Sequence, residues 1–122
     1  MRLDQLAGFI DAEVVHGQEM LESIEIDHVY GADLMSDVLA FAQPGSLLLT
    51  GLTNIQIVRT AQMMDLPAVV FVRGKYPQKE AVDLAISLDM PVMVCHKSMF
   101  EACGILFREG LLPCSIEKRQ AP

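Results

Sequence analysis

Charged and polar side chains gather directly after two short apolar runs of the sequence. Those after the first run are Arg73 and Lys75, and those after the second are His96, Lys97 and Ser98. Cationic side chains bind phosphate and carboxylate oxygens through charge-assisted hydrogen bonds. Three of the nine Lys and Arg residues of the chain fall in these two short loops. The pattern therefore indicates a site for a small anionic ligand, such as a nucleotide.

The apolar runs themselves predict the elements that position these side chains. Ser46–Thr50, Ala68–Val72 and Pro91–Cys95 are apolar nearly throughout, which is typical of strands buried on both faces of a parallel sheet. They begin 22 and then 23 residues apart, which is room for a strand, a helix and two loops. The sequence thus predicts an α/β fold: a single three-layer domain with a mostly parallel sheet flanked by helices.

The other segments complete this expectation. Apolar residues at helical spacing predict helices over 3–10, 33–42, 54–64, 78–88 and 98–109. Two more strands are expected at 12–16 and 26–30, with a polar loop at 18–25 between them. Thr53 and Ser98 fit the capping box as helix N-caps. The expected domain covers residues 1–112, and residues 113–122 are expected to be a C-terminal tail that docks at its start.

Parallel strands bring their carboxyl ends to one edge, where open α/β sheets bind ligands. The helices that follow direct N–H groups to the same edge. The predicted rim is cationic and rich in donors, and the candidate ligand contacts are Thr50, Thr53, Asn54, Arg73, Lys75, His96 and Ser98. The alternative is that strand-end loops are simply polar and that Thr53 and Ser98 serve only as caps. Asp33 and Asp37, four residues apart on one predicted helix, could bind together, or could simply enrich a helix N-terminus in acidic residues.

Other chemistries find less support in the residues. Cys95, Cys103 and Cys114 show no CxxC spacing, so no metal site is predicted. Cys95 and His96 are adjacent on a strand and therefore point to opposite faces, which disfavours a nucleophile–base pair. The phosphate-binding GxxxxGK[ST], the dinucleotide GxGxxG and the nucleophile-elbow GxSxG are all absent from the sequence. We expect no catalytic residues and no cofactor.

Composition limits the partners of the chain. Its 122 residues carry a net charge of −7, with a pI of about 4.7, which argues against nucleic-acid and anionic-membrane surfaces. Apolar residues make up 52%, enough for a folded core, yet the apolar stretches are too short to span a membrane. Three cysteines and an N-terminus without an export signal predict a cytoplasmic protein.

Several blocks of the sequence resemble small DRTGG-domain proteins. The segment from Tyr30 to Ala40, which reads YGADLMSDVLA, is the most specific of them. Pro44–Thr50 with Thr53–Ile55, and Phe71–Pro77, are similar to two further blocks, so the resemblance extends over about residues 1–112. Within the first block, Asp33, Ser36 and Asp37 are family-motif residues without an assigned role.

The resemblance implies a fold similar to the N-terminal domain of HPr kinase/phosphorylase. Related domains occur in phosphotransacetylases and in CBS-domain pyrophosphatases, where they are regulatory and dimer-forming. It therefore implies a non-catalytic regulatory or ligand-sensing module that forms homodimers and acts on a partner protein. Two alternatives stay open: a purely structural dimerisation domain, and a phosphoryl- or acyl-transfer enzyme with chemistry around His96 and Arg73.

Overall fold

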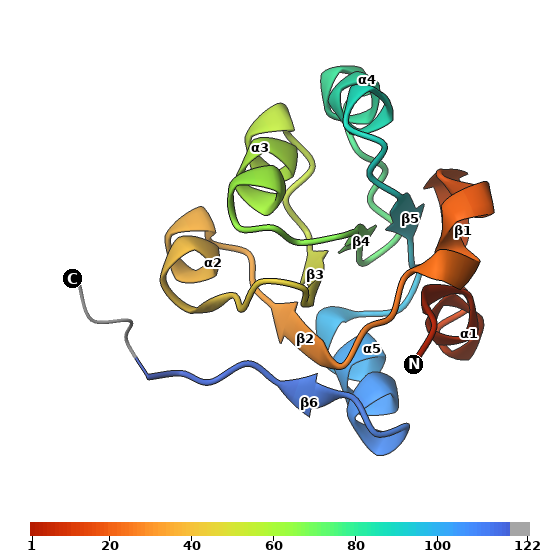
Figure 1. Cartoon of the computed structure of the whole chain (residues 1–122), viewed down its shortest axis with the longest axis vertical. Helices are drawn as coiled ribbons and strands as arrows, with labels where there is room; N and C mark the ends of the chain where they lie inside the picture. Colours follow the sequence, from red (N-terminus) through yellow and green to blue (C-terminus); the bar gives the residue numbers. More distant parts are fainter. Residues whose placement is uncertain (118–122) are drawn as a thin grey trace.

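The computed structural model describes residues 1–117 as one six-stranded sheet with helices on both faces (Figure 1). The elements, in chain order, are α1 (Leu3–Phe9), β1 (Glu13–His16), the 3₁₀-helix η1 (Gln18–Ser23), β2 (His28–Gly31), α2 (Met35–Phe41), β3 (Leu47–Thr50), α3 (Ile55–Met63), β4 (Val69–Phe71), α4 (Lys79–Ser87), β5 (Val92–Val94), α5 (Met99–Arg108) and β6 (Leu112–Pro113).

The strands lie in the order β1-β5-β4-β3-β2-β6. The pairs from β5 to β6 are all parallel, and β1 alone is antiparallel, to β5. This confirms the expected mostly parallel sheet, including the expected strand near residue 30. The antiparallel direction of β1 places its first residue, rather than its last, at the carboxyl edge of its neighbours.

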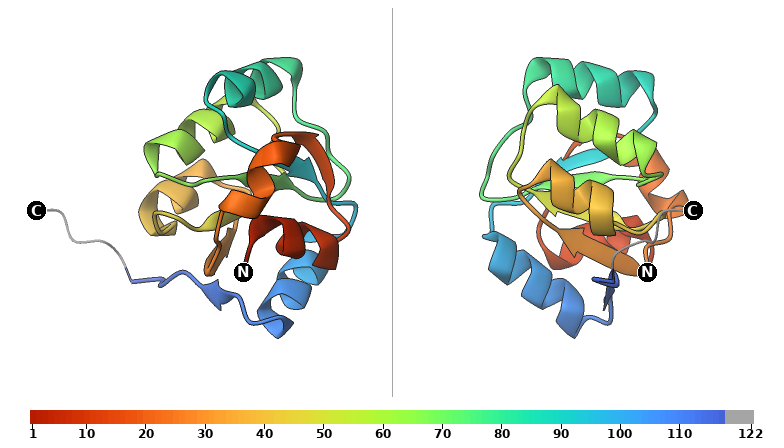
Figure 2. Two further views of the ribbon diagram at one scale, coloured as in Figure 1. Left: turned by 45° about the vertical axis from the view of Figure 1, so that its right-hand side comes forward. Right: turned by 90° about the vertical axis from the view of Figure 1, so that its left-hand side faces the viewer.

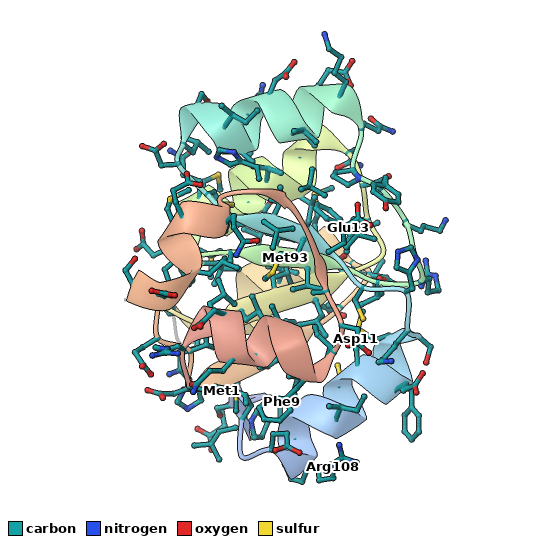
Figure 3. All side chains as sticks on the ribbon, turned by 90° about the vertical axis from the view of Figure 1, so that its right-hand side faces the viewer. Met1, Phe9, Asp11, Glu13, Met93 and Arg108 are labelled. Carbon is teal, nitrogen blue, oxygen red and sulfur yellow. The ribbon has the colours of Figure 1, made fainter. Side chains whose placement is uncertain are left out.

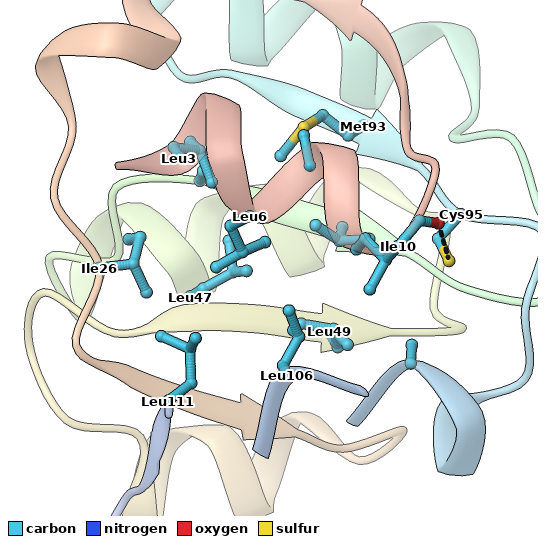
Figure 4. Packing of buried hydrophobic residues seen from close by; sticks show 14 of the residues in the cluster. Leu3, Leu6, Ile10, Ile26, Leu47, Leu49, Met93, Cys95, Leu106 and Leu111 are labelled. Carbon is cyan, nitrogen blue, oxygen red and sulfur yellow. Dashed lines mark hydrogen bonds between the residues drawn. The ribbon is translucent and has the colours of Figure 1, made fainter. Parts of the chain in front are cut away.

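Helices cover both faces of the sheet, as expected for three layers. α2, α3 and α4 lie on one face, and α1 and α5 lie on the other (Figures 1 and 2). Residues of the central strands alternate between two cores: Leu47 and Leu49 pack toward α1 and α5 (Figure 4), whereas Leu48 packs toward α2 and α3. Every residue of β3, β4 and β5 is buried, which explains their continuous apolar runs.

Two expectations about local structure were wrong. Residues 18–25 were expected to form a loop, but Gln18–Ser23 forms η1, which buries Leu21. The turn into η1 needs glycine, because Gly17 has a φ of +96° and a Cβ there would lie 2.8 Å from the Cα of Pro91. The N-cap of α3 is Asn54 rather than Thr53, since the Asn54 side chain accepts a hydrogen bond from the Ile57 N–H at 3.2 Å.

The segment after α5 docks on the sheet, as expected. Leu112 and Pro113 form β6 beside β2, and both Leu111 and Cys114 are buried. The tail that was expected from residue 113 thus begins inside β6. Residues 118–122 of that expected tail lie outside the described part of the chain.

Candidate functional site

The candidate site lies at the carboxyl edge of the sheet, where the loops after β2, β3, β4 and β5 meet. α4 and α5 leave β4 and β5 toward opposite faces (Figure 1). In open α/β sheets such a divergence opens a ligand crevice. Here the two loops are joined, because Arg73 N–H donates to the Lys97 carbonyl at 2.9 Å and Gly74 N–H donates to the Cys95 carbonyl at 3.0 Å.

Arg73 is the centre of this edge. Its backbone is left-handed, with a φ of +60°, and the two hydrogen bonds above hold that conformation in place. Its guanidinium lies over Gly51 so closely that a Cβ on Gly51 would collide with it. The guanidinium also reaches Asp33, with Nη1 at 3.2 Å from Oδ2, and the Arg73 side chain is 44% exposed. Three loops therefore fix one exposed cation.

Asp33 completes this group from the loop after β2. Its Oδ1 accepts a hydrogen bond from the Gly51 N–H at 2.6 Å, while its Oδ2 pairs with Arg73. The sequence identified Asp33 as a family-motif residue without an assigned role. In the structure, the Asp33 carboxylate orients the Arg73 guanidinium. Ser36 and Asp37 lie instead in the first turn of α2. Burial, followed by the charge of Asp37, raises the pKa of the Tyr30 hydroxyl.

A second group forms around Glu13, at the start of β1. Its Oε1 accepts a hydrogen bond from the Tyr76 hydroxyl at 2.6 Å and lies 3.9 Å from His96 Nε2. The Tyr76 and His96 rings meet edge-on, with centroids 6.3 Å apart. The hydrogen bond to Glu13, followed by burial, raises the pKa of Tyr76 above its usual range, so this hydroxyl remains a neutral donor at physiological pH.

The rim is balanced in charge rather than cationic, which corrects the expectation from sequence. Lys97 Nζ lies 3.6 Å from Asp11 Oδ2, and Asp33 and Glu13 lie beside Arg73 and His96. Asp11 and Glu13 lie toward the right-hand side of Figure 3. The Lys75 residue is exposed, and its side chain makes no hydrogen bond or ion pair within residues 1–117. Three carboxylates thus accompany Arg73, Lys75 and Lys97.

The remaining candidate ligand contacts stabilise the loops and helices around the rim. Thr50 is buried, and its Oγ1 accepts a hydrogen bond from the Leu52 N–H at 3.1 Å. Thr53 accepts a backbone hydrogen bond from Gln78 N–H at 2.9 Å, and Asn54 caps α3. Ser98 caps α5, as expected, through the Glu101 N–H at 3.1 Å. The structure therefore brings Arg73, Lys75 and His96 to one exposed rim and uses the other four residues as supports.

Sequence reasoning missed Asp11, Glu13 and the role of Tyr76. No periodicity indicates the direction of a lone edge strand, and only the antiparallel β1 brings two carboxylates to this rim. The cysteines belong to the interior: Cys95 Sγ donates to the Ile10 carbonyl at 3.3 Å (Figure 4), and burial raises the pKa values of Cys95 and Cys103. Within residues 1–117, no three His, Cys, Asp or Glu side chains are placed to hold a metal ion.

Comparison with known proteins assigns the family. A model described as the DRTGG domain matches residues 5–108. The chain belongs to the DRTGG domain family. The match therefore covers most of α1 and every later element through α5, including both groups of side chains at the rim.

A solved structure shares the fold of this DRTGG domain. It is the crystal structure of the CBS and DRTGG domains of the regulatory region of Clostridium perfringens pyrophosphatase, complexed with its activator diadenosine tetraphosphate. The TM-score is 0.69 at 19% sequence identity, over 92% of this chain and 47% of that chain. The chain therefore spans about half the length of that regulatory region. No curated protein sequence matches the chain.

No helix within residues 1–117 is both long enough and apolar enough to cross a membrane.

Proposed function

We propose that this DRTGG domain is a non-catalytic regulatory module that senses a nucleotide at the carboxyl edge of its sheet, forms homodimers and acts on a partner protein. The observation that carries the proposal is Arg73: a left-handed, multiply fixed backbone that presents a half-exposed guanidinium between Asp33 and Gly51. Strained, over-determined residues cluster at ligand sites. The pyrophosphatase region that shares the fold is regulatory and binds a dinucleotide activator, which supports the same class of role here.

The charge balance of the rim favours a nucleotide over a simple anion. Arg73 and Lys75 offer donors for phosphate oxygens. Asp33 and Glu13 offer acceptors, which suit the hydroxyls of a ribose and the amino group of a base but repel a bare phosphate. A ligand that carries both phosphate and neutral donors therefore matches the rim best.

The positions of the titratable groups support an enzymatic function less well than a non-catalytic one. A general base must lie within hydrogen-bond reach of a nucleophile. The ion-pair neighbour of His96 in residues 1–117 is the carboxylate of Glu13, while the Cys95 thiol donates to the Ile10 carbonyl in the core.

Thermal unfolding with ATP, ADP, diadenosine tetraphosphate and inorganic phosphate tests the proposal. A nucleotide at about 100 times its Kd should stabilise the fold by about 2.7 kcal/mol, which corresponds to a Tm increase of roughly 10 °C. The double variant Arg73→Ala/Lys75→Ala should lose this increase. The matched variant Arg2→Ala/Arg59→Ala, which removes two exposed arginines away from the rim, should keep it.

Each other result contradicts part of the proposal. An equal Tm increase in both double variants would mean that the nucleotide binds away from the rim. A wild-type chain that responds to none of the four compounds and yet has a dimeric mass would overturn ligand sensing and favour the second candidate, a purely structural dimerisation domain. Conversion of the added nucleotide to product during the incubation would overturn the non-catalytic assignment.

A further inference from the structure

The outer face of α5 carries an unusual set of exposed residues. Phe100 is 88% exposed and Phe107 is 68% exposed. Glu101, Gly104 and Arg108 are exposed on the same side of the helix, opposite the buried Ala102 and Leu106. Large aromatic side chains that share one exposed helix face mark an interaction surface.

Gly104 lies at the centre of this face, and the fold of the chain gives no reason for it. A Cβ at Gly104 would meet no atom within 4 Å. Glycine inside a helix costs roughly 0.5–1 kcal/mol relative to alanine. What glycine provides is close approach of another backbone, so the missing side chain fits a helix that crosses α5 at this point.

The residues around Gly104 form a self-complementary pattern. Phe100 precedes Gly104 by four residues and Phe107 follows it by three, and both lie on one flank of the helix face. Glu101 precedes it by three and Arg108 follows it by four, both on the other flank. An antiparallel copy of α5 that crosses at Gly104 would thus place Phe100 beside Phe107 of the partner subunit. It would also place Glu101 beside Arg108 of the partner subunit.

We infer that α5 packs antiparallel against α5 of a second copy, across a two-fold axis that passes between the two Gly104 residues. In such an interface each contact occurs twice: two aromatic pairs on one flank and two Glu–Arg pairs on the other. Within one chain Arg108 reaches only its neighbour Glu109, at 3.3 Å, and Glu101 has no ion-pair partner in residues 1–117. The two charges therefore remain available to a partner.

Charge and apolar surface around α5 favour a second copy of this chain as the partner of the α5 face. A chain with a net charge of −7 repels its own kind, so a contact between copies needs local attraction. The two Glu101–Arg108 pairs supply it. Phe107 also borders an apolar cavity of about 280 Å³ between α5, β2 and the segment after Gly110, which extends the apolar flank of the same face. Arg108 lies at the lower edge of Figure 3, away from Glu13 and the rim.

This inference rests on the homodimer part of the proposed function and is independent of the nucleotide part. The test is the dimer dissociation constant from sedimentation equilibrium of the full chain between 1 and 100 µM. Glu101→Arg and Arg108→Glu should each raise that constant at least tenfold, because each creates two like-charged pairs. The double variant Glu101→Arg/Arg108→Glu should return to within a few-fold of wild type.

Two further variants separate the interface from the stability of the monomer. Gly104→Gln should raise the dissociation constant at least tenfold, whereas the Tm at the lowest concentration should not fall, since the site has open space. Arg59→Glu makes the same charge change as Arg108→Glu, on α3, and should leave the dissociation constant unchanged.

The outcomes are distinguishable. A wild-type dimer that the single charge reversals weaken and the double reversal restores supports the α5 interface. A wild-type dimer that Glu101→Arg, Arg108→Glu and Gly104→Gln all leave intact overturns this interface while homodimerisation stands. A wild-type monomer at 100 µM overturns both, and the nucleotide-dependent Tm of the same samples still tests the ligand site on its own.

Discussion

Arg73 shows how single residues define the candidate site. Its left-handed backbone turns the chain back after β4, and the next residue, Gly74, has a φ of +65°. Two consecutive left-handed residues make a tight turn, and the second lies against His96. The turn therefore fixes the positions of both Arg73 and His96 at once.

Replacement of Gly74 tests this turn. Gly74→Ala adds a Cβ only 2.8 Å from His96 Nδ1 and places an L side chain in the left-handed region. We expect unfolding in urea to show a loss of about 1–2 kcal/mol of stability, and the His96 ring resonances to shift in NMR spectra. Gly8→Ala is the control, because a Cβ at Gly8 meets nothing within 4 Å. Equal stabilities for the two variants would contradict the described turn.

At this scale the sequence predicted which cations reach the rim but not which anions do. Arg73, Lys75 and His96 follow apolar runs, so their place is set by local order along the chain. Asp11 and Glu13 reach the rim only through the pairing of β1 with β5, about 80 residues away. A count of charges in the strand-end loops therefore overestimated the positive charge of the site.

Among the elements, the central strands were the most predictable and η1 was the least. The runs at 46–50, 68–72 and 91–95 extend only one residue beyond β3, β4 and β5 at one or both ends. Burial on both faces makes such strands apolar throughout, which leaves a clear pattern. Residues 18–25 have no such pattern, because a short 3₁₀-helix that buries only Leu21 can be polar elsewhere.

The docking of β6 can be tested with two adjacent leucines. Leu111 is 4% exposed, whereas Leu112 is 53% exposed. Leu111→Ala should therefore destabilise the fold by about 2–5 kcal/mol, and Leu112→Ala by about 0.5 kcal/mol or less, in urea unfolding. The two variants differ only in which leucine is shortened. The reverse order would mean that the segment docks in a register shifted by one residue.

For the whole molecule, the raised pKa values of two cysteines and two tyrosines predict a loss of stability in alkaline solution. Burial raises the pKa values of Cys95, Cys103 and Tyr30, and the Glu13 hydrogen bond raises that of Tyr76. The unfolded chain, with ordinary pKa values, releases these protons first as the pH rises. The contribution is therefore complete below the ordinary pKa values and is lost as the pH rises through the raised ones.

Urea unfolding at pH 7, 8, 9 and 10 measures this dependence. We expect the free energy of unfolding to fall between pH 8 and pH 10, and to fall less steeply in the variant Cys95→Ala/Tyr30→Phe, which lacks two of the groups with raised pKa values. A constant or rising free energy over that interval would contradict the protonation states that the structure indicates.

The pairing of the two edge strands also affects the order in which the parts of the chain fold. β2 to β5 follow one another along the chain and pair with their nearest predecessors, so they can assemble step by step during synthesis. β1 pairs with residues 92–94, and β6 pairs with residues 28–29. Each edge must close a loop of about 80 residues, and such distant contacts form slowly. On the ribosome, the first strand made is therefore among the last to find its place, and Asp11 and Glu13 reach the rim only when it does.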